Sequence, residues 1–373
     1  MKKYLLLFLV VLGAVVTLAS CGTDTYEIAL ITDKGNIDDK SFNQGAWEGV
    51  VAFAEENNIT HQYYKPEEAT SDAYLAAIDL AVQGGAKVVV TPGFLFEVPI
   101  YTAQTTYPDV KFILLDGSPH TADYATFNTA SNVASVMYAE QESGWLAGYA
   151  AVMDGMRELG FMGGMAVPAV QAFGYGYLQG AEYAAAQLSV NVNVKYHYTG
   201  DFEENDTNKA TAATMFQGGT EVIFAAGGSV GKSVMSAASE ASKKVIGVDV
   251  DQRYDSETVI TSAMKGLAAS VQQVLDAIYN TDSFATFGGT TTYFNATNDG
   301  IGLPTTVIGD ANGDAFDRFD TFDLAAYNTA YQLLVAGTVS PLRTITVAAD
   351  SGEATAAELV AGLSLVRVSV TVI

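Results

Sequence analysis

The fold of this chain is decided by residues 27–56, which read EIALITDKGNIDDKSFNQGAWEGVVAFAEE. Glu27–Thr32 is a short apolar run that predicts a buried strand, and Asp33 ends it. Ser41–Glu56 carries apolar side chains at helical spacing, and the acidic pair at 38–39 precedes it, as is typical of a helix N-terminus. A buried strand that runs directly into a helix is the repeating unit of α/β proteins with parallel sheets.

The same unit recurs along the chain. The predicted strands are 87–91, 110–115, 160–162, 192–199, 221–226, 244–248 and 259–261, and the predicted helices are 73–83, 142–153, 176–188, 232–241 and 266–279. The pattern runs twice, across roughly 27–140 and 158–262, so we expect two lobes with a cleft between them. The tail from Thr305 differs, because aspartates cluster in it and its end, Leu363–Ile373, resembles a strand.

Composition excludes several classes of protein. Of 373 residues, 49% are hydrophobic and 16% are charged, which is too apolar for a disordered chain. The 18 basic and 42 acidic residues give a formal net charge of -24, which repels phosphate backbones and argues against binding of nucleic acid. One Cys and three scattered His exclude an internal disulfide and a zinc site built on thiolates.

The N-terminus predicts export. Lys2 and Lys3 precede an apolar run from Leu5 to Leu18, and small residues lead to the lone Cys21. This arrangement is typical of a secretory signal and is too short for a membrane-spanning helix. Leu-Ala-Ser-Cys at 18–21 resembles a bacterial lipobox, which implies removal of residues 1–20, a diacylated Cys21 and a short tether over 21–26. An uncleaved membrane anchor is the alternative.

A candidate phosphate-binding loop lies at residues 226–233, which read AGGSVGKS. It follows a predicted strand and opens a helix, but Ala226 stands where the motif G-x-x-x-x-G-K-[ST] has its first Gly. Binding of ATP through Lys232 is one interpretation. The other is that Gly227 and Gly228 only form a tight turn between strand and helix. The predicted export favours the turn.

Two further motifs are weak. Residues 174–180, GYGYLQG, have three residues between their last glycines where the dinucleotide-binding fingerprint has two, so close helix packing is favoured. Residues 310–314, DANGD, place three potential calcium ligands correctly. Ala315 and Thr321 stand where an EF-hand loop has Gly and Glu, so a solvated acidic loop is favoured and no metal is expected.

A fourth set of residues shares one position in the predicted units, just after the ends of strands. Ligands of open α/β sheets bind outside the carboxyl ends of strands, so these residues and two aromatic residues near helix starts are candidates for one ligand site. Taken singly, an Asp there is usually a turn or cap residue and a Phe usually belongs to the core. The candidates are Asp33, Phe42, Asp116, Phe173, Gly227, Asp249 and Lys265.

The opening stretch ALITDKGNIDDKSFNQGAWEG, residues 29–49, resembles the start of the basic membrane protein family, the substrate-binding lipoproteins of ABC transporters that include the purine nucleoside receptors. The resemblance runs in order over about 27–305. It returns at 112–116, 160–165, 173–180, 223–228, 245–252 and 261–265.

The resemblance implies a two-lobed, type I periplasmic-binding-protein fold without covalent chemistry or cofactor. Its first lobe would take 27–140 and about 266–304, its second 141–265 and part of 305–345, and 346–373 would be an extension of unknown role. Three groups of residues would hold a purine nucleoside. Phe42 and Phe173 would stack on the base, with Tyr175 as a possible substitute for Phe173; Asp33 and Asp116 would bind the base edge; Gly227, Asp249 and Lys265 would hold the ribose.

The implied partners are a purine nucleoside of the guanosine, inosine and adenosine class, a nucleoside permease with a separate ATPase subunit, and the membrane through lipidated Cys21. An exported nucleoside- or nucleotide-processing enzyme is the alternative, although no His lies near the motifs to serve as acid or base. A surface lipoprotein that kept the fold without transport is the third interpretation.

Overall fold

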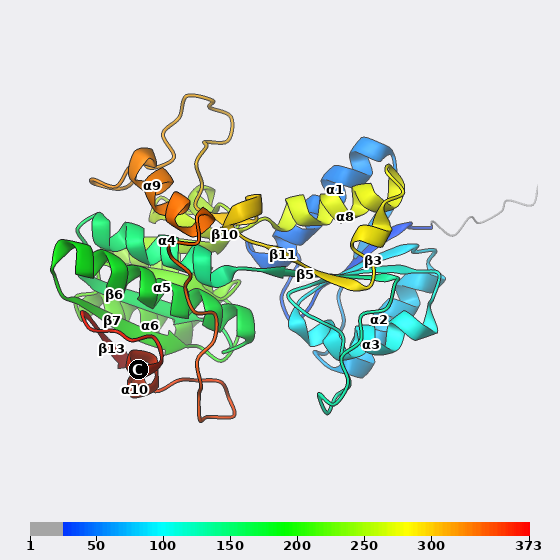
Figure 1. The fold of residues 1–373 in the computed structure, drawn as a ribbon, viewed down its shortest axis with the longest axis horizontal. Coiled ribbons are helices and arrows are strands. Elements are labelled where there is room, and N and C mark those ends of the chain that lie inside the picture. Colours follow the sequence, from blue (N-terminus) through cyan, green and yellow to red (C-terminus); the bar gives the residue numbers. More distant parts are fainter. Residues whose placement is uncertain (1–24) are drawn as a thin grey trace, which may run out of the picture.

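The computed structural model describes residues 25–373, so the predicted signal segment 1–20 and Cys21 lie outside the described residues, as does most of the tether. Two lobes lie side by side, each built on its own sheet with helices on both faces (Figure 1). Within 25–373, no helix combines the length and the apolar character that crossing a membrane requires.

The first lobe contains a six-stranded sheet in the order β11-β5-β4-β3-β1-β2, with every neighbouring pair parallel. Its strands are β1 (Ile28–Ile31), β2 (His61–Tyr64), β3 (Val88–Pro92), β4 (Lys111–Leu115), β5 (Val133–Tyr138) and β11 (Thr290–Phe294). Helices α1 (Phe42–Asn57) and α8 (Leu267–Tyr279) cover one face, and α2 (Ser71–Gln83) and α3 (Glu97–Thr106) cover the other.

The second lobe contains a seven-stranded sheet in the order β12-β10-β9-β8-β6-β7-β13, in which only the β10–β12 pair is antiparallel. Its strands are β6 (Glu158–Gly163), β7 (Val192–Tyr198), β8 (Val222–Ala226), β9 (Lys244–Asp249), β10 (Val259–Lys265), β12 (Ile301–Gly302) and β13 (Val368–Val372). Its helices are α4 (Glu140–Met153), α5 (Pro168–Leu188), α6 (Asp206–Gln217), α7 (Val230–Ala241), α9 (Leu324–Val335) and α10 (Ala356–Gly362).

Burial of both sheet faces explains why the strands read as continuous apolar runs. In β1, Ile28 and Leu30 join the core under α1 and α8, whereas Ala29 and Ile31 join the core under α2 and α3, and all four are fully buried. Burying one such aliphatic side chain contributes about 1.5–3 kcal/mol. The runs therefore belong to a sheet that both layers of helices protect from water.

Some element limits differ from those expected. Helix α5 begins at Pro168 rather than near residue 176, and a proline is favourable in the first turn of a helix. Phe173 consequently lies within the helix. Strand β10 continues to Lys265 rather than ending at Thr261, so Lys265 is the last residue of a strand.

The chain passes between the lobes three times, from β5 to α4, from β10 to α8 and from β11 to β12. The last passage returns to the second sheet at Ile301, inside the stretch 266–304 that we expected in the first lobe. Residues 346–373 supply α10 and β13, and β13 extends the second sheet by pairing with β7. The tail thus completes the second lobe.

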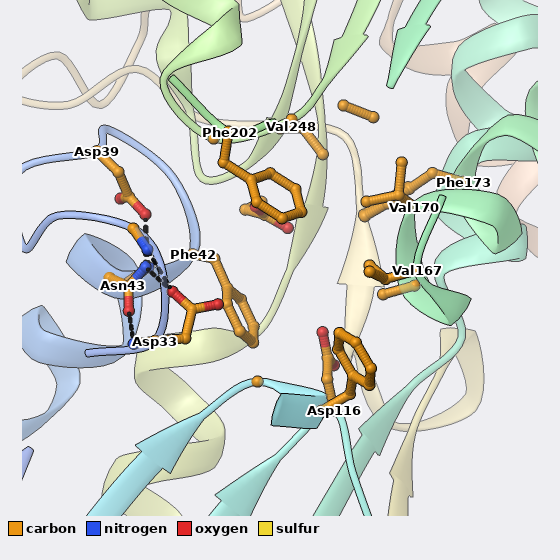
Figure 2. A pocket seen from close by; sticks show the side chains of 18 of the residues that line it. Asp33, Asp39, Phe42, Asn43, Asp116, Val167, Val170, Phe173, Phe202 and Val248 are labelled. Carbon is orange, nitrogen blue, oxygen red and sulfur yellow. Dashed lines mark hydrogen bonds between the residues drawn. The ribbon is translucent and has the colours of Figure 1, made fainter. Parts of the chain in front are cut away.

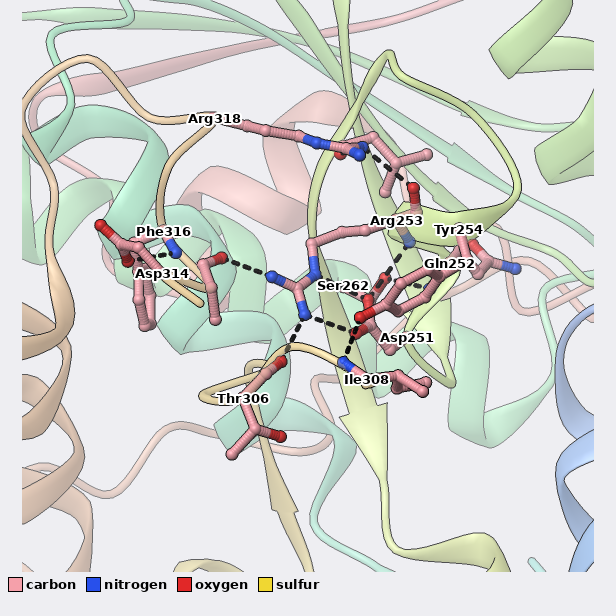
Figure 3. Close-up of polar contacts among 12 residues, drawn as sticks. Asp251, Gln252, Arg253, Tyr254, Ser262, Thr306, Ile308, Asp314, Phe316 and Arg318 are labelled. Atoms are coloured by element: carbon pink, nitrogen blue, oxygen red, sulfur yellow. Dashed lines mark hydrogen bonds and ion pairs between the residues drawn. The ribbon is translucent and has the colours of Figure 1, made fainter. Parts of the chain in front are cut away.

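The acidic segment that follows β12 and includes Thr306 and Ala315 is held against the second lobe by a buried arginine (Figure 3). The guanidinium of Arg253 donates to the carbonyls of Thr306 and Ala315, both at 2.7 Å, and pairs with Asp251 at 2.6 Å. Charge-assisted hydrogen bonds of this kind are stronger than neutral ones. The segment therefore folds back onto the turn after β9.

Candidate ligand-binding site

One cavity gathers all seven candidate residues of the sequence. It encloses about 750 Å³ of empty space, including open solvent at its mouth, and is lined by residues of both lobes. Asp33, Phe42 and Asp116 come from the first lobe, and Phe173, Gly227, Asp249 and Lys265 from the second. The carboxyl ends of parallel strands from two sheets meet here, as the rule for open α/β sheets predicts.

Two of the carboxylates sit on unusual backbone. Asp116, directly after β4, has a φ of 57°, and Asp249, at the end of β9, has a φ of 67°. Aspartate tolerates this left-handed region better than most residues other than glycine. Such backbone concentrates at functional sites, because the surrounding structure must hold it in place.

A buried lysine connects these carboxylates. The Nζ of Lys265 lies 2.5 Å from Asp116 Oδ2, 3.3 Å from Glu140 Oε1 and 3.8 Å from Asp249 Oδ1. Burial alone would lower the pKa of Lys265, but the three neighbouring carboxylates outweigh burial and raise it, so the ammonium stays charged. Burial raises the pKa of Asp116 and of Asp249, and Lys265 opposes this rise at both.

A second polar cluster lies at the start of α1 (Figure 2). Asn43 donates from Nδ2 to Asp33 Oδ1 and to Asp39 Oδ2, both at 2.9 Å, and accepts from the Asp33 amide. Asp39 also accepts from the amides of Asn43 and Gln44, which have no partner inside the first turn of α1. Burial raises the pKa of Asp33 to about 6. Asn43 and Asp39 therefore fix the carboxylate of Asp33 at the cavity wall.

Four phenylalanines line the cavity: Phe42, Phe94, Phe173 and Phe202. The ammonium of Lys265 lies 4.6 Å from the ring centre of Phe42 and 5.4 Å from that of Phe173. Phe173 is only 2% exposed and packs edge-on against Phe224, with 5.8 Å between the two ring centres. Phe202, which the sequence did not single out, also lines the cavity and is only partly buried (Figure 2). Phe42 and Phe202 thus offer more free aromatic surface than Phe173.

Direct contacts join the lobes around the cavity. Ser41 Oγ donates to Asp249 Oδ2 at 2.5 Å, and Gln252 Nε2 donates to the carbonyl of Lys40 at 2.6 Å. Lys232 Nζ donates to the carbonyl of Asp38 at 3.0 Å. The loop between β1 and α1 therefore contacts the second lobe, and these contacts enclose the cavity.

Comparison with known proteins identifies the family. Residues 27–325 match the family described as ABC transporter substrate-binding protein, PnrA-like. The chain belongs to the Bmp family.

Two relatives at 30% identity span most of the chain. The ABC transporter nucleoside-binding protein BmpA of Lactococcus lactis subsp. cremoris matches over 335 residues, 81% of this chain and 91% of that protein. Basic membrane protein A of Borreliella burgdorferi matches over 293 residues, 76% of this chain and 82% of that protein. The resemblance inferred from residues 29–49 is thereby confirmed.

Solved structures confirm the fold of this Bmp protein. An ABC transporter solute-binding protein from Aeropyrum pernix K1 superposes with a TM-score of 0.72 at 22% identity, covering 86% of this chain and 94% of its own. Another from Conexibacter woesei superposes with a TM-score of 0.65 at 23% identity, covering 86% and 99%. The Lactococcus relative and both solved structures are named as binding proteins of ABC transporters.

The glycines of the two competing motifs have structural roles in this Bmp protein. Gly228 has a φ of 56° in the turn between β8 and α7, and a Cβ on Gly227 would lie 2.7 Å from the amide nitrogen of Gly164. A Cβ on Gly176 or Gly180 would overlap a carbonyl of α4. The first pair therefore forms a tight turn, and the second pair lets α4 and α5 pack closely.

Other candidates lie away from the cavity. Tyr175 is 1% exposed and is absent from the cavity lining, so the structure does not offer it as a substitute for Phe173. In the loop at 310–314, Asp310 and Asp314 accept hydrogen bonds from the amides of Asn312 and Phe316. Within 25–373 no group of three or more His, Cys, Asp or Glu residues is placed to hold a metal ion.

Glu140 is a buried partner of Lys265 that sequence reasoning missed. It is fully buried at the first residue of α4, directly after the passage from β5. Its acidic neighbour Glu142 and the apolar run that follows read only as the start of a helix. Glu140 thus carried no sequence signal for its contact with Lys265.

Proposed function

We propose that this protein binds purine nucleosides outside the cytoplasmic membrane and delivers them to an ABC permease powered by a separate ATPase subunit. One observation carries the proposal. The cavity combines aromatic faces with buried carboxylates around a single lysine, in a family whose relative from Lactococcus lactis is named a nucleoside-binding protein.

The chemistry of the cavity matches the two halves of a nucleoside. Aromatic faces stack on bases at about 1–3 kcal/mol per base. Phe42, with Phe202 or Phe173, would hold the purine ring, and Asp33 would accept from its N–H groups. Ionised carboxylates only accept hydrogen bonds, and the two ribose hydroxyls can donate to Asp249, whose ionised form Lys265 favours.

The charge balance favours a ligand that donates. Asp33, Asp39, Asp116 and Asp249 line the cavity, and Lys265 is the one cationic side chain among its lining residues. A phosphorylated ligand would add negative charge next to these carboxylates. Lys232, the cation of the phosphate-loop interpretation, contacts the carbonyl of Asp38 instead. A neutral nucleoside is therefore favoured over a nucleotide.

We further propose that Cys21 is lipidated and holds the protein at the extracytoplasmic face of the membrane. The support is the sequence at 18–21, since these residues lie outside the described structure. Two acyl chains give stable anchoring where one chain gives only marginal affinity.

Mass spectrometry of ligand released from the purified chain tests the binding proposal directly. We expect a purine nucleoside in the released fraction, and calorimetric binding of added guanosine after that ligand is removed. Conversion of inosine to free base would support the enzyme alternative. Absence of any nucleoside-induced thermal shift would favour a surface lipoprotein without transport.

A further inference from the structure

The C-terminal tail is fixed along one face of α5. Gln179 makes two hydrogen bonds with the backbone of Leu342, at 2.8 and 3.0 Å, and Gln171 donates to the carbonyl of Gly352 at 2.9 Å. Glu182 accepts from the amides of residues 366–368. The family match ends at residue 325, so these contacts join a helix inside the match to a tail outside it.

Arg343, next to the fixed Leu342, bridges the first passage between the lobes. Its Nη1 donates to the carbonyl of Tyr138, the last residue of β5, at 2.7 Å. The same nitrogen pairs with Glu140 Oε2 at the start of α4. One tail side chain therefore contacts both sides of the passage at Ala139.

Glu140 connects Arg343 to the ligand site. It is fully buried, and its second oxygen, Oε1, has no hydrogen-bond partner within the described chain although it lies 3.3 Å from Lys265 Nζ. Lys265 in turn contacts Asp116 and Asp249. A continuous series of charges thus runs from Arg343 through Glu140 and Lys265 to the cavity.

The carboxyl groups of this series outnumber the ammonium of Lys265 that they share. Three buried carboxylates surround one ammonium, and a buried carboxylate without a partner is strongly unfavourable. Arg343 forms an ion pair with Glu140, which leaves Lys265 free to pair with Asp116 and Asp249. Without Arg343, Glu140 would compete with them for the lysine.

We propose that Arg343 is a positioning residue of the ligand site: by neutralising Glu140, it holds Lys265 against Asp116 and Asp249 in the geometry that receives the ligand's hydroxyl groups. This inference rests on the proposed nucleoside-binding function. It makes the tail a part of the binding apparatus.

Guanosine titrations by calorimetry test the role of Arg343. Arg343→Gln should weaken binding about tenfold, the loss expected for one charge-assisted hydrogen bond. Arg343→Lys should recover part of the affinity, because it restores the charge. The double variant Arg343→Gln/Glu140→Gln should bind more tightly than Arg343→Gln, since a neutral side chain at 140 no longer competes for Lys265.

Arg367→Gln is the matched control, because Arg367 also lies in the tail but forms no ion pair with any described residue. It should bind guanosine like the parent protein. If Arg343 only held the tail against the second lobe, Arg343→Gln and the double variant would lose the same amount of guanosine affinity. That result, or unchanged affinity in Arg343→Gln, would overturn the positioning role.

The parent protein separates this inference from the function on which it rests. Failure of the parent to bind any nucleoside would overturn the proposed function and the inference together. Parent binding with an unaffected Arg343→Gln variant would overturn the inference alone. Should Arg343→Gln fail to fold, a folded double variant that binds guanosine supports the role, and one that does not bind refutes it.

Discussion

Replacing Asp249 with asparagine tests the ribose contact with the least disturbance to the backbone. Asn tolerates the left-handed φ of 67° as well as Asp does, whereas alanine would strain it. Asp249 accepts from Ser41 at 2.5 Å and lies 3.8 Å from Lys265, and Asn keeps one acceptor oxygen without the charge. The substitution therefore removes charge from the site and leaves its shape.

Two effects of Asp249→Asn have opposite signs. Loss of one charge-assisted hydrogen bond to a ribose hydroxyl costs about 1.5–3 kcal/mol, which corresponds to about a ten- to hundredfold loss in affinity. Burial raises the pKa of Asp249, so this group increasingly destabilises the ligand-free fold as pH rises above the ordinary pKa of an aspartate. We therefore expect guanosine affinity to fall while the melting temperature at neutral pH stays constant or rises.

Titration of guanosine, 2′-deoxyguanosine and guanine against parent and variant provides the assay. The parent should bind them in that order of decreasing affinity, and Asp249→Asn should lose most of the preference for ribose. Asp255→Asn is the control for a lost carboxylate between the lobes: Asp255 pairs with Lys40 at 3.6 Å and does not line the cavity, so this variant should keep the parent's order of the three ligands. Equal affinity of the parent for guanine and guanosine would refute the reasoning.

The structure also bears on the competing role for Asp249 as a helix cap. The short helix that follows, Gln252–Tyr254, is capped by Asp251, which accepts from the amide of Arg253. Asp249 instead faces Ser41 and Lys265. If Asp249→Asn leaves nucleoside affinity unchanged, a helix-capping role of Asp249 would therefore not explain that result.

Four further outcomes are expected. Phe42→Ala should cost about 1–3 kcal/mol of guanosine binding by calorimetry, and unchanged binding would leave Phe42 a core residue. Lys232→Ala removes one exposed hydrogen bond to the carbonyl of Asp38, so nucleoside affinity should change by no more than about threefold. Magnesium-dependent binding of ATP by the parent protein would instead support the phosphate-loop interpretation. Because burial raises the pKa of Asp33 to about 6, guanosine affinity should fall as pH drops below about 6, and Asp33→Asn should remove that contribution. Cys21→Ser should abolish labelling by a palmitate analogue and release the protein or leave its precursor, and continued labelling would contradict lipidation.

The candidate site could be predicted because position along a parallel strand carries spatial information. Asp116 and Asp249 follow runs that are apolar because both sheet faces are buried. Residues at the carboxyl ends of such strands share one edge of a sheet, so sequence order alone grouped them. Phe42 and Phe173 joined the same set because they lie near the starts of predicted helices.

The remaining features depend on contacts that the sequence pattern does not encode. Phe202 lies in the irregular loop after β7, where no periodicity marks it as facing a cavity. The resemblance grouped Asp116 with Asp33, but the structure pairs Asp116 with Lys265 at 2.5 Å. Arg343 reaches Glu140 across a separation of 203 residues along the chain. Only the packing of the tail on α5 brings these two side chains together.

The placement of the charged cluster suggests why ligand binding and closure of the lobes are one event in such a site. Lys265 precedes one passage between the lobes and Glu140 follows another, while Asp116 and Asp249 belong to opposite lobes. Moving the lobes apart would separate Lys265 from at least one carboxylate and leave that carboxylate partly unpaired. A ligand that donates hydroxyl groups to both lobes stabilises the arrangement in which every charge has a partner. The free energy of binding and the free energy of closure therefore depend on the same few contacts.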